Sequence, residues 1–450
     1  MARGEIRSVA ILGGGPAGAA LGTFLARAGV DVTLFDGGKR PPLIVGESLV
    51  PAVVPFLRAL GIEDEVASYS TFKPGATFTF DEGDTMSFLF DEVRSARTPY
   101  SYNVPRDRLD RSVREAALRA GVRLVPRHGR VAVDAATGDE EGSRRMRAAW
   151  EDVGAPGHAA TGDEAARAAA PDAPVRLAAE SLEAAGLGAQ PDFVVDAAGR
   201  VRLLGRLLEL PVVEGGRRDT ALHTHLEGVP LLHQGHVHTD RLEHGWSWRI
   251  PLPGRVSVGL VIDAAVLREF GDSAEEQFDA YLRHDRRLRE WGAYAKRIAP
   301  VVKYTNYQLR HTRGVGPNWA LLGDAFGFVD PVFSSGMLVG LDAARELAAT
   351  LLAGAGPERL ARYEAHVLHH LANWHRVAGW FYDGRLFTLL KLGDEKRDEF
   401  PWQWVDPHFR KHLPRVFTGE STTKRYSTGL LGFMVRFALF GTDPGPLAIR

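Results

Sequence analysis

SVAILGGGPAGAAL, residues 8–21, is the stretch that decides the fold. It begins as an apolar, β-prone run and continues into Gly13, Gly15 and Gly18, which have the G-x-G-x-x-G spacing of a strand–turn–helix unit. Gly13 allows a tight turn, Gly15 lets the backbone approach a pyrophosphate, and Gly18 lets the helix pack closely on the strand. The free N–H groups at the helix start, near Ala17, can bind phosphate oxygens. The stretch therefore predicts a dinucleotide-binding unit.

A second strand follows at residues 30–35 and ends at Asp36. An acidic residue at that point is placed to accept hydrogen bonds from a ribose diol. Strand, turn, helix, second strand and acidic residue come in register, so the sequence indicates a bound dinucleotide; the alternative is a glycine turn that holds no ligand. The motif alone does not choose between FAD and NAD.

The composition is that of an ordinary globular protein. The chain has 450 residues, of which 45% are hydrophobic and 25% charged, and its net charge of −1 argues against a nucleic-acid-binding protein. It contains no cysteine, which excludes disulfides, cysteine nucleophiles and zinc–thiolate sites. The sequence predicts no membrane span, and the short segment before the first strand predicts no signal peptide. We therefore expect a cytoplasmic protein.

Two later motifs place acidic residues where strands end. Asp196 and Gly199 follow a buried strand, and Gly323-Asp324-Ala325 lies between a strand and a helix. A carboxylate at Asp324 can hold a ribityl hydroxyl, and the following helix N-terminus can face a flavin pyrimidine ring or an anion. An NAD dehydrogenase does not need three such widely separated elements, so together they favour FAD.

The three elements together resemble the FAD-dependent family that comprises aromatic hydroxylases, geranylgeranyl reductases and flavin halogenases. The resemblance implies an α/β fold with a Rossmann-like FAD-binding domain, an antiparallel β-sheet substrate domain and a helical C-terminal region. The expected bounds are 1–70, 101–215 and 301–350 for the discontinuous FAD-binding domain, 71–100 and 216–300 for the substrate-side sheet domain, and 351–450 for the helical region. Residues 135–190, rich in Ala, Gly, Glu and Arg, are expected to form a surface insertion.

Five stretches narrow the resemblance to flavin-dependent halogenases. WSWRIP at 246–251 matches the family's W-x-W-x-I-P signature, and GESLVP at 46–51 resembles its G-E-S-x-x-P element beside the flavin. FKPGATF at 72–78 is similar to the segment that carries the catalytic lysine, and DPVFSSG at 330–336 resembles the halide-binding turn. WFYD at 380–383 resembles part of the helical region in halogenases that act on phenols and pyrroles.

The resemblance implies catalytic roles for four residues, which are Lys73, Trp246, Trp248 and Glu47. Lys73 would receive hypohalous acid, made from reduced FAD, dioxygen and chloride or bromide, and deliver the halogen to an aromatic ring. Trp246 and Trp248 would keep the organic substrate away from the flavin. Lys73 is expected to point into a mainly apolar passage, and burial there would lower its pKa.

The remaining implied roles concern the flavin and the halide. Glu47 is expected to act beside the flavin, and backbone N–H groups near Ser335 and Gly336 are expected to bind the halide. The expected contacts of FAD are Gly13, Gly15, Ala17, Gly18, Asp36, Ser48, Arg106, Asp196, Gly199, Asp324 and Gly336. No second dinucleotide motif is visible, so a separate flavin reductase is expected to supply reduced FAD.

Each matched residue also has a plain structural interpretation. The two tryptophans share one strand face and can be a core pair. Lys73 can be a solvated loop lysine, Glu47 a surface charge and Arg106 a helix-start residue, while the turn at 334–336 can be a helix cap. Four histidines alternate along predicted strands, but no carboxylate pattern accompanies them, so no metal site is predicted. These are His223, His225, His236 and His238.

One departure from the family pattern limits the classes of substrate that the resemblance implies. Halogenases of free tryptophan carry a glutamate just before the Ser-Ser/Thr-Gly of the turn, and this chain has Phe333 there. The resemblance therefore implies an electron-rich phenol or pyrrole, free or tethered to a carrier protein, in natural-product biosynthesis. Two alternatives stay open: an FAD-dependent monooxygenase or reductase of the same fold, and a flavin-binding protein without turnover.

Overall fold

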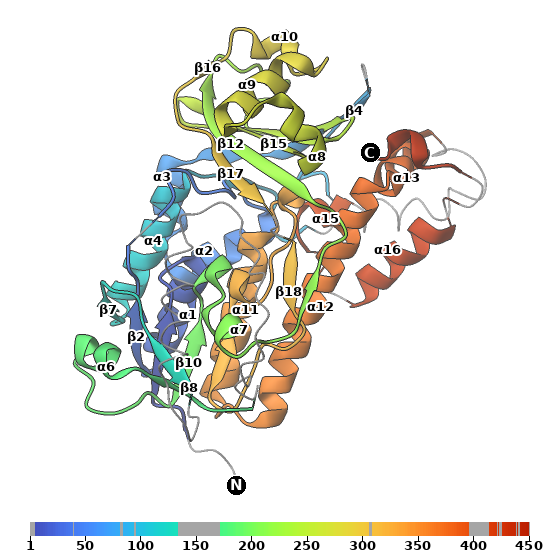
Figure 1. Cartoon of the computed structure of the whole chain (residues 1–450). Helices are drawn as coiled ribbons and strands as arrows, with labels where there is room; N and C mark the ends of the chain where they lie inside the picture. The colour runs from blue at the N-terminus through green and yellow to red at the C-terminus, as the bar shows by residue number, and fades with distance from the viewer. Residues whose placement is uncertain are drawn as a thin grey trace.

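A computed structural model describes most of the chain, with a parallel sheet in one layer and a larger, mostly antiparallel sheet above it (Figure 1). The described residues are 5–38, 40–81, 84–93, 96–133, 172–305, 308–395, 414–420, 422, 425–437, 439 and 442–449. Most of the insertion expected at 135–190 therefore lies outside the described residues.

The N-terminal motif forms the centre of a five-stranded parallel sheet. The order across the sheet is β19-β10-β1-β2-β7, so strands from distant parts of the chain lie side by side. Helix α1 starts directly after the glycine turn and contacts α4 and α11. The bounds are β1 (Ser8–Leu12), α1 (Pro16–Arg27), β2 (Asp31–Phe35), α4 (Arg106–Arg119), β7 (Arg123–Val125), β10 (Phe193–Asp196), β19 (Trp319–Leu321) and α11 (Gly336–Leu352).

The larger sheet has the order β16-β12-β15-β14-β13-β4-β5, and β17 also pairs with β12. Every pairing in it is antiparallel except that of β13 with β4. Four consecutive strands, β12 to β15, occupy most of residues 219–263 and lie inside the range expected for the substrate-side sheet domain. The bounds are β4 (Gly75–Asp81), β5 (Asp84–Leu89), β12 (Asp219–Glu227), β13 (Val237–Leu242), β14 (Gly245–Leu252), β15 (Arg255–Asp263), β16 (Lys296–Arg297) and β17 (Val302–Thr305).

A second hydrophobic core lies between this sheet and three short helices at the top of the molecule (Figure 1). Leu222 and Val258 from the sheet are buried together with Phe278 and Trp291 from the helices. The helices are α8 (Ala264–Leu267), α9 (Ala274–His284) and α10 (Arg289–Gly292). β17 begins at residue 302, inside a range expected for the FAD-binding domain, yet it pairs with β12 of the larger sheet.

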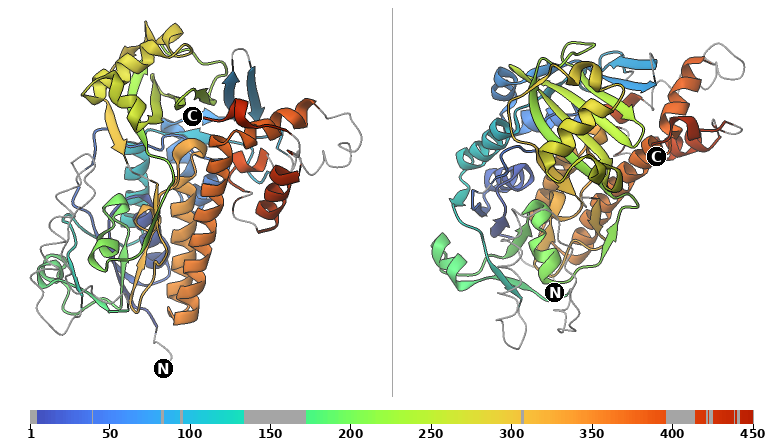
Figure 2. Two further views of the ribbon diagram at one scale, coloured as in Figure 1. Left: turned by 45° about the vertical axis from the view of Figure 1, so that its right-hand side comes forward. Right: turned by 45° about the horizontal axis from the view of Figure 1, so that its top comes forward.

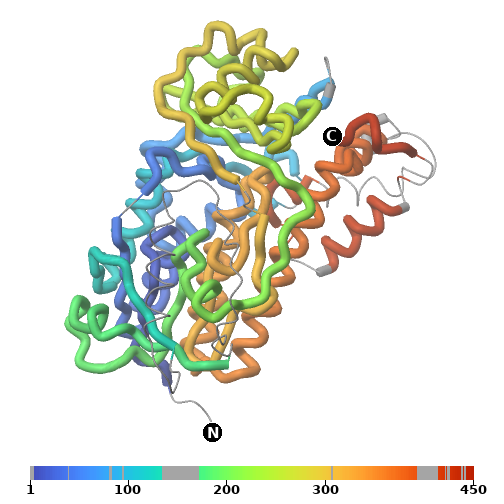
Figure 3. The backbone as a smooth tube through the Cα atoms, in the orientation of Figure 1, coloured from blue at the N-terminus to red at the C-terminus, as the bar shows by residue number. Residues whose placement is uncertain are grey.

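Shorter elements complete the fold, and the course of the chain through them can be followed as a tube in Figure 3. β3 pairs with β6, β8 with β9, and β11 with β18. The bounds are α2 (Val54–Leu60), α3 (Glu63–Tyr69), β3 (Thr71–Lys73), β6 (Ser101–Asn103), β8 (Val131–Val133), β9 (Val175–Leu177), α6 (Ala179–Ala185), α7 (Leu203–Leu207), β11 (Val212–Glu214), β18 (Leu309–His311), η5 (Gly323–Ala325) and η6 (Pro331–Phe333).

The C-terminal region is helical, as predicted. Its longest helix, α12, runs beside α11, and the two lie next to each other in Figure 2. The bounds are α12 (Pro357–Tyr382), α13 (Arg385–Glu395), α15 (Pro414–Phe417) and α16 (Arg425–Phe437). Among the described residues, no helix has both the length and the apolar character that crossing a membrane requires. The predicted α/β class with a Rossmann-like domain is confirmed.

Candidate active site

A cavity lies where the glycine turn, the loop at 45–48, strand β14 and the turn before α11 meet. These elements come from both sheets and from segments far apart along the chain. The predicted site residues that line the cavity are Gly15, Ala17, Ser48, Arg106, Gly199, Trp246, Trp248, Asp324 and Gly336. The predicted site residues outside its lining are Gly13, Gly18, Asp36, Glu47, Lys73, Asp196 and Ser335.

The glycines of the predicted site form two groups, according to which atoms an added side chain would meet. An added Cβ at Gly15, Gly199 or Gly336 would meet no atom within 4 Å, so these glycines leave space beside the backbone. At Gly18 a Cβ would lie 2.2 Å from the carbonyl oxygen of Gly13, whose own φ is +118°. Gly13 and Gly18 thus allow the turn and its packing, while the other three leave room for a ligand.

Arg106 ties the loop at 45–48 to helix α4. Its Nε donates to Asp110 Oδ1 at 3.0 Å, and its Nη1 donates to the carbonyl oxygen of Val45. The Gly46 backbone has a φ of +97°, and Arg106 Nη1 would lie 2.7 Å from a Cβ at that position. Glycine is therefore the residue that suits position 46, where the loop passes next to the guanidinium group of Arg106.

The three acidic residues expected around FAD lie in different settings. Asp324 lines the cavity, where burial raises the pKa of its carboxyl while Arg200 and Arg106 oppose that shift. Asp196 lies behind the cavity and accepts from the backbone N–H groups of Ala198 and Leu204, at 3.0 and 2.8 Å. Burial raises the pKa of Asp196 to about 6. Asp196 therefore supports the turn rather than facing the cavity.

Asp36 ends β2 as predicted, but its carboxylate pairs with arginines. Its Oδ2 lies 2.8 Å from Arg40 Nη2 and 3.4 Å from Arg114 Nη1. Its Oδ1 accepts from the N–H of Gly38 at 3.1 Å. A ribose hydroxyl would share this carboxylate with the two guanidinium groups.

The residues of the cavity fit FAD. Asp324 accepts no hydrogen bond within the part of the chain that the structure describes, so its carboxylate is available to a ribityl hydroxyl. Ser48 lines the cavity, and its buried Oγ likewise has no partner among the described residues. The glycines leave space beside the backbone, and the helix α1 N-terminus can receive a pyrophosphate.

Two indoles form one wall of the cavity. Trp246 and Trp248 point to the same side of β14, as their period of two predicted, and their ring centroids lie 5.6 Å apart. Trp246 Nε1 donates to Tyr382 Oη at 2.9 Å, and Tyr382 Oη donates to Asp330 Oδ2 at 2.8 Å. Both rings are buried, so the wall is fixed by packing and by hydrogen bonds.

The turn before α11 lines the same cavity as the two indoles. Ser334 lines the cavity and has a φ of +55°, an uncommon conformation for a residue with a side chain. The side chain of Ser335 is buried, and its Oγ has no hydrogen-bond partner among the described residues. Asp330 supports the turn by accepting from the N–H of Val332 at 3.0 Å, and burial raises the pKa of Asp330 to about 6.

Phe333 occupies the position before the two serines and packs into an aromatic cluster. Its ring centroid lies 6.2 Å from that of Trp374 and 5.9 Å from those of Phe381 and Phe417. The side chain therefore serves packing at a position where a carboxylate would be buried among rings.

Lys73 ends β3 and is 2% exposed, which excludes the solvated-lysine interpretation. Its Nζ donates to the carbonyl oxygen of Leu49 at 2.8 Å and lies 5.4 Å from the Phe90 ring centroid. Burial lowers the pKa of Lys73 to about 7, as expected. Lys73 does not line the cavity, but its partner Leu49 directly follows Ser48, which does.

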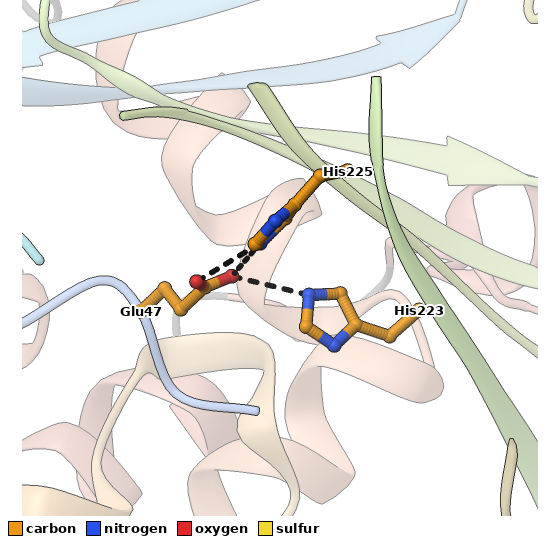
Figure 4. A group of neighbouring side chains, drawn as sticks. All are labelled: Glu47, His223 and His225. Carbon is orange, nitrogen blue, oxygen red and sulfur yellow. Dashed lines mark hydrogen bonds and ion pairs between the residues drawn. The ribbon is translucent and has the colours of Figure 1, made fainter. Parts of the chain in front are cut away.

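Glu47 points away from the cavity, although Gly46 and Ser48 on either side of it line the wall. Its carboxylate lies between two histidines of β12, as Figure 4 shows. His223 Nε2 lies 3.1 Å from Oε2, and His225 Nε2 lies 3.0 Å from Oε1. These hydrogen bonds lower the pKa of Glu47 to about 2 in spite of burial. The surface-charge interpretation of Glu47 is wrong.

Two groups of titratable side chains among the described residues have the composition of metal sites: Glu47 with His223 and His225, and Asp342 with His366 and His370. No metal was predicted because no carboxylate accompanied the strand histidines in the sequence. That reason was incomplete, because the fold brings Glu47 to them from a segment 176 residues away.

Sequence reasoning gave no functional role to Asp330, His223 or His225. Tyr382 and Asp330 were visible only as members of matched stretches, and the hydrogen bond between them joins residues 52 positions apart. Alternation of His223 and His225 along one strand was the available signal for the histidine pair. No pattern within the sequence indicated Glu47 as their partner.

Comparisons with known proteins agree with this geometry. Residues 7–153 match the family described as FAD binding domain, and residues 177–385 match the family described as tryptophan halogenase. The chain is 27% identical to the flavin-dependent halogenase armH5 of Armillaria mellea, over 81% of this chain and 68% of that protein. It is 25% identical to a 1H-pyrrole-2-carbonyl-[peptidyl-carrier protein] chlorinase of Pseudomonas fluorescens, over 92% of this chain and 89% of that protein.

Solved structures share the fold. The flavin-dependent brominase Bmp2 superposes with a TM-score of 0.70 at 18% identity, covering 98% of this chain and 99% of that one. The myxobacterial chondrochloren halogenase CndH superposes with a TM-score of 0.64 at 23% identity, covering 99% and 100%. A curated relative from Pestalotiopsis fici, the flavin-dependent halogenase ptaM, is longer, and the match covers 60% of it. The family matches and these relatives show that the chain is similar to FAD-dependent halogenases, and the residues of the cavity fit FAD.

Proposed function

We propose that this enzyme halogenates an electron-rich phenol or pyrrole, with Lys73 as the residue that delivers the halogen. When bound, reduced FAD supplies the electrons with which dioxygen oxidises chloride or bromide to hypohalous acid. A separate flavin reductase is proposed as the source of reduced FAD. The observation that supports the proposal most directly is the wall of Trp246 and Trp248, which closes one side of the FAD cavity.

The chain's own residues would divide the remaining work. Backbone N–H groups at Ser335 and Gly336 lie at the start of α11, where the helix dipole favours an anion. The indole wall would keep an aromatic substrate from the flavin ring. The amine of Lys73, with its pKa near 7, would exist in both protonation states around neutral pH. In one state it donates to hypohalous acid, and in the other it is a nucleophile.

Two features support a phenol or pyrrole over free tryptophan. Phe333 stands where tryptophan halogenases carry a glutamate, and its ring is packed among Trp374, Phe381 and Phe417. One relative is named as a chlorinase of a pyrrole bound to a peptidyl carrier protein. We therefore include carrier-bound pyrroles among the proposed substrates.

The test is intact-mass analysis of phenols and pyrroles, free and carrier-bound, after incubation with the enzyme, FAD, a flavin reductase and halide. The expected product has the chlorine or bromine isotope pattern, and it is lost in Lys73→Ala but kept in Lys296→Ala, an exposed lysine. A product that is hydroxylated and carries no halogen would assign the chain to the monooxygenase alternative. Full activity of Lys73→Ala would remove Lys73 from the mechanism.

A further inference from the structure

We propose that His223 and His225 are positioning residues that hold Glu47 as a carboxylate and link it through Ser257 to the indole of Trp248. The proposal rests on the proposed function, since it names residues that shape the cavity for that reaction. It gives a role to a histidine pair that the halogenation scheme does not use.

The hydrogen bonds of the network cross between the two parts of the molecule. Glu47 belongs to the loop at 45–48, which is hydrogen-bonded to the β6 segment, and both histidines belong to β12 of the larger sheet (Figure 4). His225 Nε2 lies 3.0 and 3.1 Å from the two carboxylate oxygens. His223 Nε2 lies 3.1 Å from Glu47 Oε2 and 3.1 Å from Ser257 Oγ. Trp248 Nε1 donates to the same Ser257 Oγ at 3.2 Å.

Arg255 fixes the tautomer of His225. Its Nε–H donates to His225 Nδ1 at 3.1 Å, so Nδ1 must present a lone pair. The ring proton of the neutral imidazole then resides on Nε2 and is donated to Glu47. His225 therefore acts as a donor whose direction is set by the arginine behind it.

His223 completes the link to the indole. Its Nδ1 is buried and has no hydrogen-bond partner within the described residues, so an N–H group there would be an unsatisfied buried donor. The proton is therefore on Nε2, which faces Glu47 and Ser257. The ring centroid of His223 also lies 5.6 Å from that of Trp248, so packing reinforces the connection.

A metal ion at the same three residues is the competing explanation. In metal sites the imidazole nitrogen that does not bind the metal normally carries a proton and donates it to an acceptor. His225 has the opposite arrangement, because Arg255 donates to that nitrogen. Binding a metal through His225 Nε2 would require a doubly deprotonated ring, so the geometry favours a hydrogen-bond network.

The network reaches the cavity at two points. Gly46 and Ser48, on either side of Glu47, line the cavity, and so does Trp248. Pulling the Glu47 side chain toward β12 therefore sets the path of the loop, while Ser257 sets the orientation of the indole. Losing His223 should disturb mainly the indole, because His225 still contacts both carboxylate oxygens of Glu47, whereas losing His225 should disturb the loop more than the indole.

The test measures the indole N–H of Trp248 by NMR on FAD-bound protein with ¹⁵N-labelled tryptophan, assigned with Trp248→Phe. We expect His223→Leu and Ser257→Ala to shift this resonance and speed its hydrogen exchange. His223→Gln, which keeps a donor near the same position, should return the resonance toward wild type. His244→Leu, a half-exposed histidine outside the network, is the matched control.

The second readout is the fraction of reduced FAD that yields halogenated product, measured beside FAD affinity. The leucine variant at His223 should lower this fraction several-fold with little change in FAD affinity, and the glutamine variant should restore much of it. An unchanged Trp248 resonance in both His223→Leu and Ser257→Ala would overturn the network. So would stoichiometric Zn²⁺ or Fe²⁺ retained by wild type and lost in His223→Leu. If wild type makes no halogenated product while the resonance responds as expected, the network stands and the proposed reaction fails.

Discussion

Replacing Lys73 by Met should change how the stability of the protein depends on pH. The side chain is 2% exposed, and burial lowers the pKa of its amine from 10.5 to about 7. Between these two pKa values the unfolded chain binds a proton that the folded chain does not. The contribution of this group to the free energy of unfolding therefore rises with pH across that window. Below about pH 7 the buried amine destabilises the folded protein by its full amount.

The magnitude follows from the two pKa values. The full difference corresponds to about 5 kcal/mol, since one pKa unit is worth about 1.4 kcal/mol. Linkage gives a penalty of roughly 5 kcal/mol at pH 6.5 and roughly 2 kcal/mol at pH 9. Lys73→Met removes the titrating group and leaves a side chain of similar length. Its stability relative to wild type should therefore fall by about 2–3 kcal/mol as the pH rises over that range.

The assay is denaturant unfolding of wild type and Lys73→Met at several pH values from 6.5 to 9, with FAD absent. Packing changes and the lost hydrogen bond to Leu49 add a constant that does not depend on pH, so only the slope of the difference matters. Lys296→Met, at an exposed position on β16, should give a flat difference. A flat difference for Lys73→Met as well would refute the claim that the folded protein buries an amine with a depressed pKa.

Three further predictions concern the cavity and a distant ion pair. Gly15→Ala should fold normally but bind FAD more weakly in a fluorescence titration, because its Cβ would occupy the space left beside the backbone for the ligand. Gly18→Ala should instead lower the melting temperature, because its Cβ would lie 2.2 Å from the carbonyl oxygen of Gly13. Trp246→Phe and Tyr382→Phe each break the hydrogen bond between these residues, so both should lower the yield of halogenated product per reduced FAD by similar factors. His366 Nε2 lies 2.7 Å from Asp342 Oδ2, which raises the pKa of His366, so its stabilising effect should be full below about pH 6.5 and be lost as the pH rises through the raised pKa. NMR titration of His366 and unfolding of His366→Gln against pH check this, and an unshifted titration would contradict it.

The sequence was most informative where local chemistry determines local structure. The glycine spacing at 13–18 requires a tight turn and close packing, and the fold shows both. The period of two in β14 predicted that Trp246 and Trp248 share a face, and both line the cavity. A lysine inside a matched stretch was expected to be buried, and Lys73 is.

The sequence was least informative where function depends on contacts between distant segments. Asp36 has the position expected of a ribose ligand, but the arginines that pair with it come from residues 40 and 114. Asp196 was expected to touch FAD, yet two backbone N–H groups hold its carboxylate behind the cavity. Glu47 has neighbours in sequence that line the cavity, but its own side chain points to β12. No local sequence pattern indicates which partners these three carboxylates have in the fold.

The two indoles of the cavity wall are anchored from opposite sides. Trp246 reaches Asp330 through Tyr382, which joins β14 to α12 and to the turn before α11. Trp248 reaches Glu47 through Ser257 and His223, which joins β14 to the loop at 45–48. Neither chain of hydrogen bonds can break without leaving buried polar atoms unpaired, which costs about 1–3 kcal/mol each. The wall is therefore stiff because three separate parts of the molecule hold it, and this stiffness fits its proposed role of keeping an aromatic substrate from the flavin.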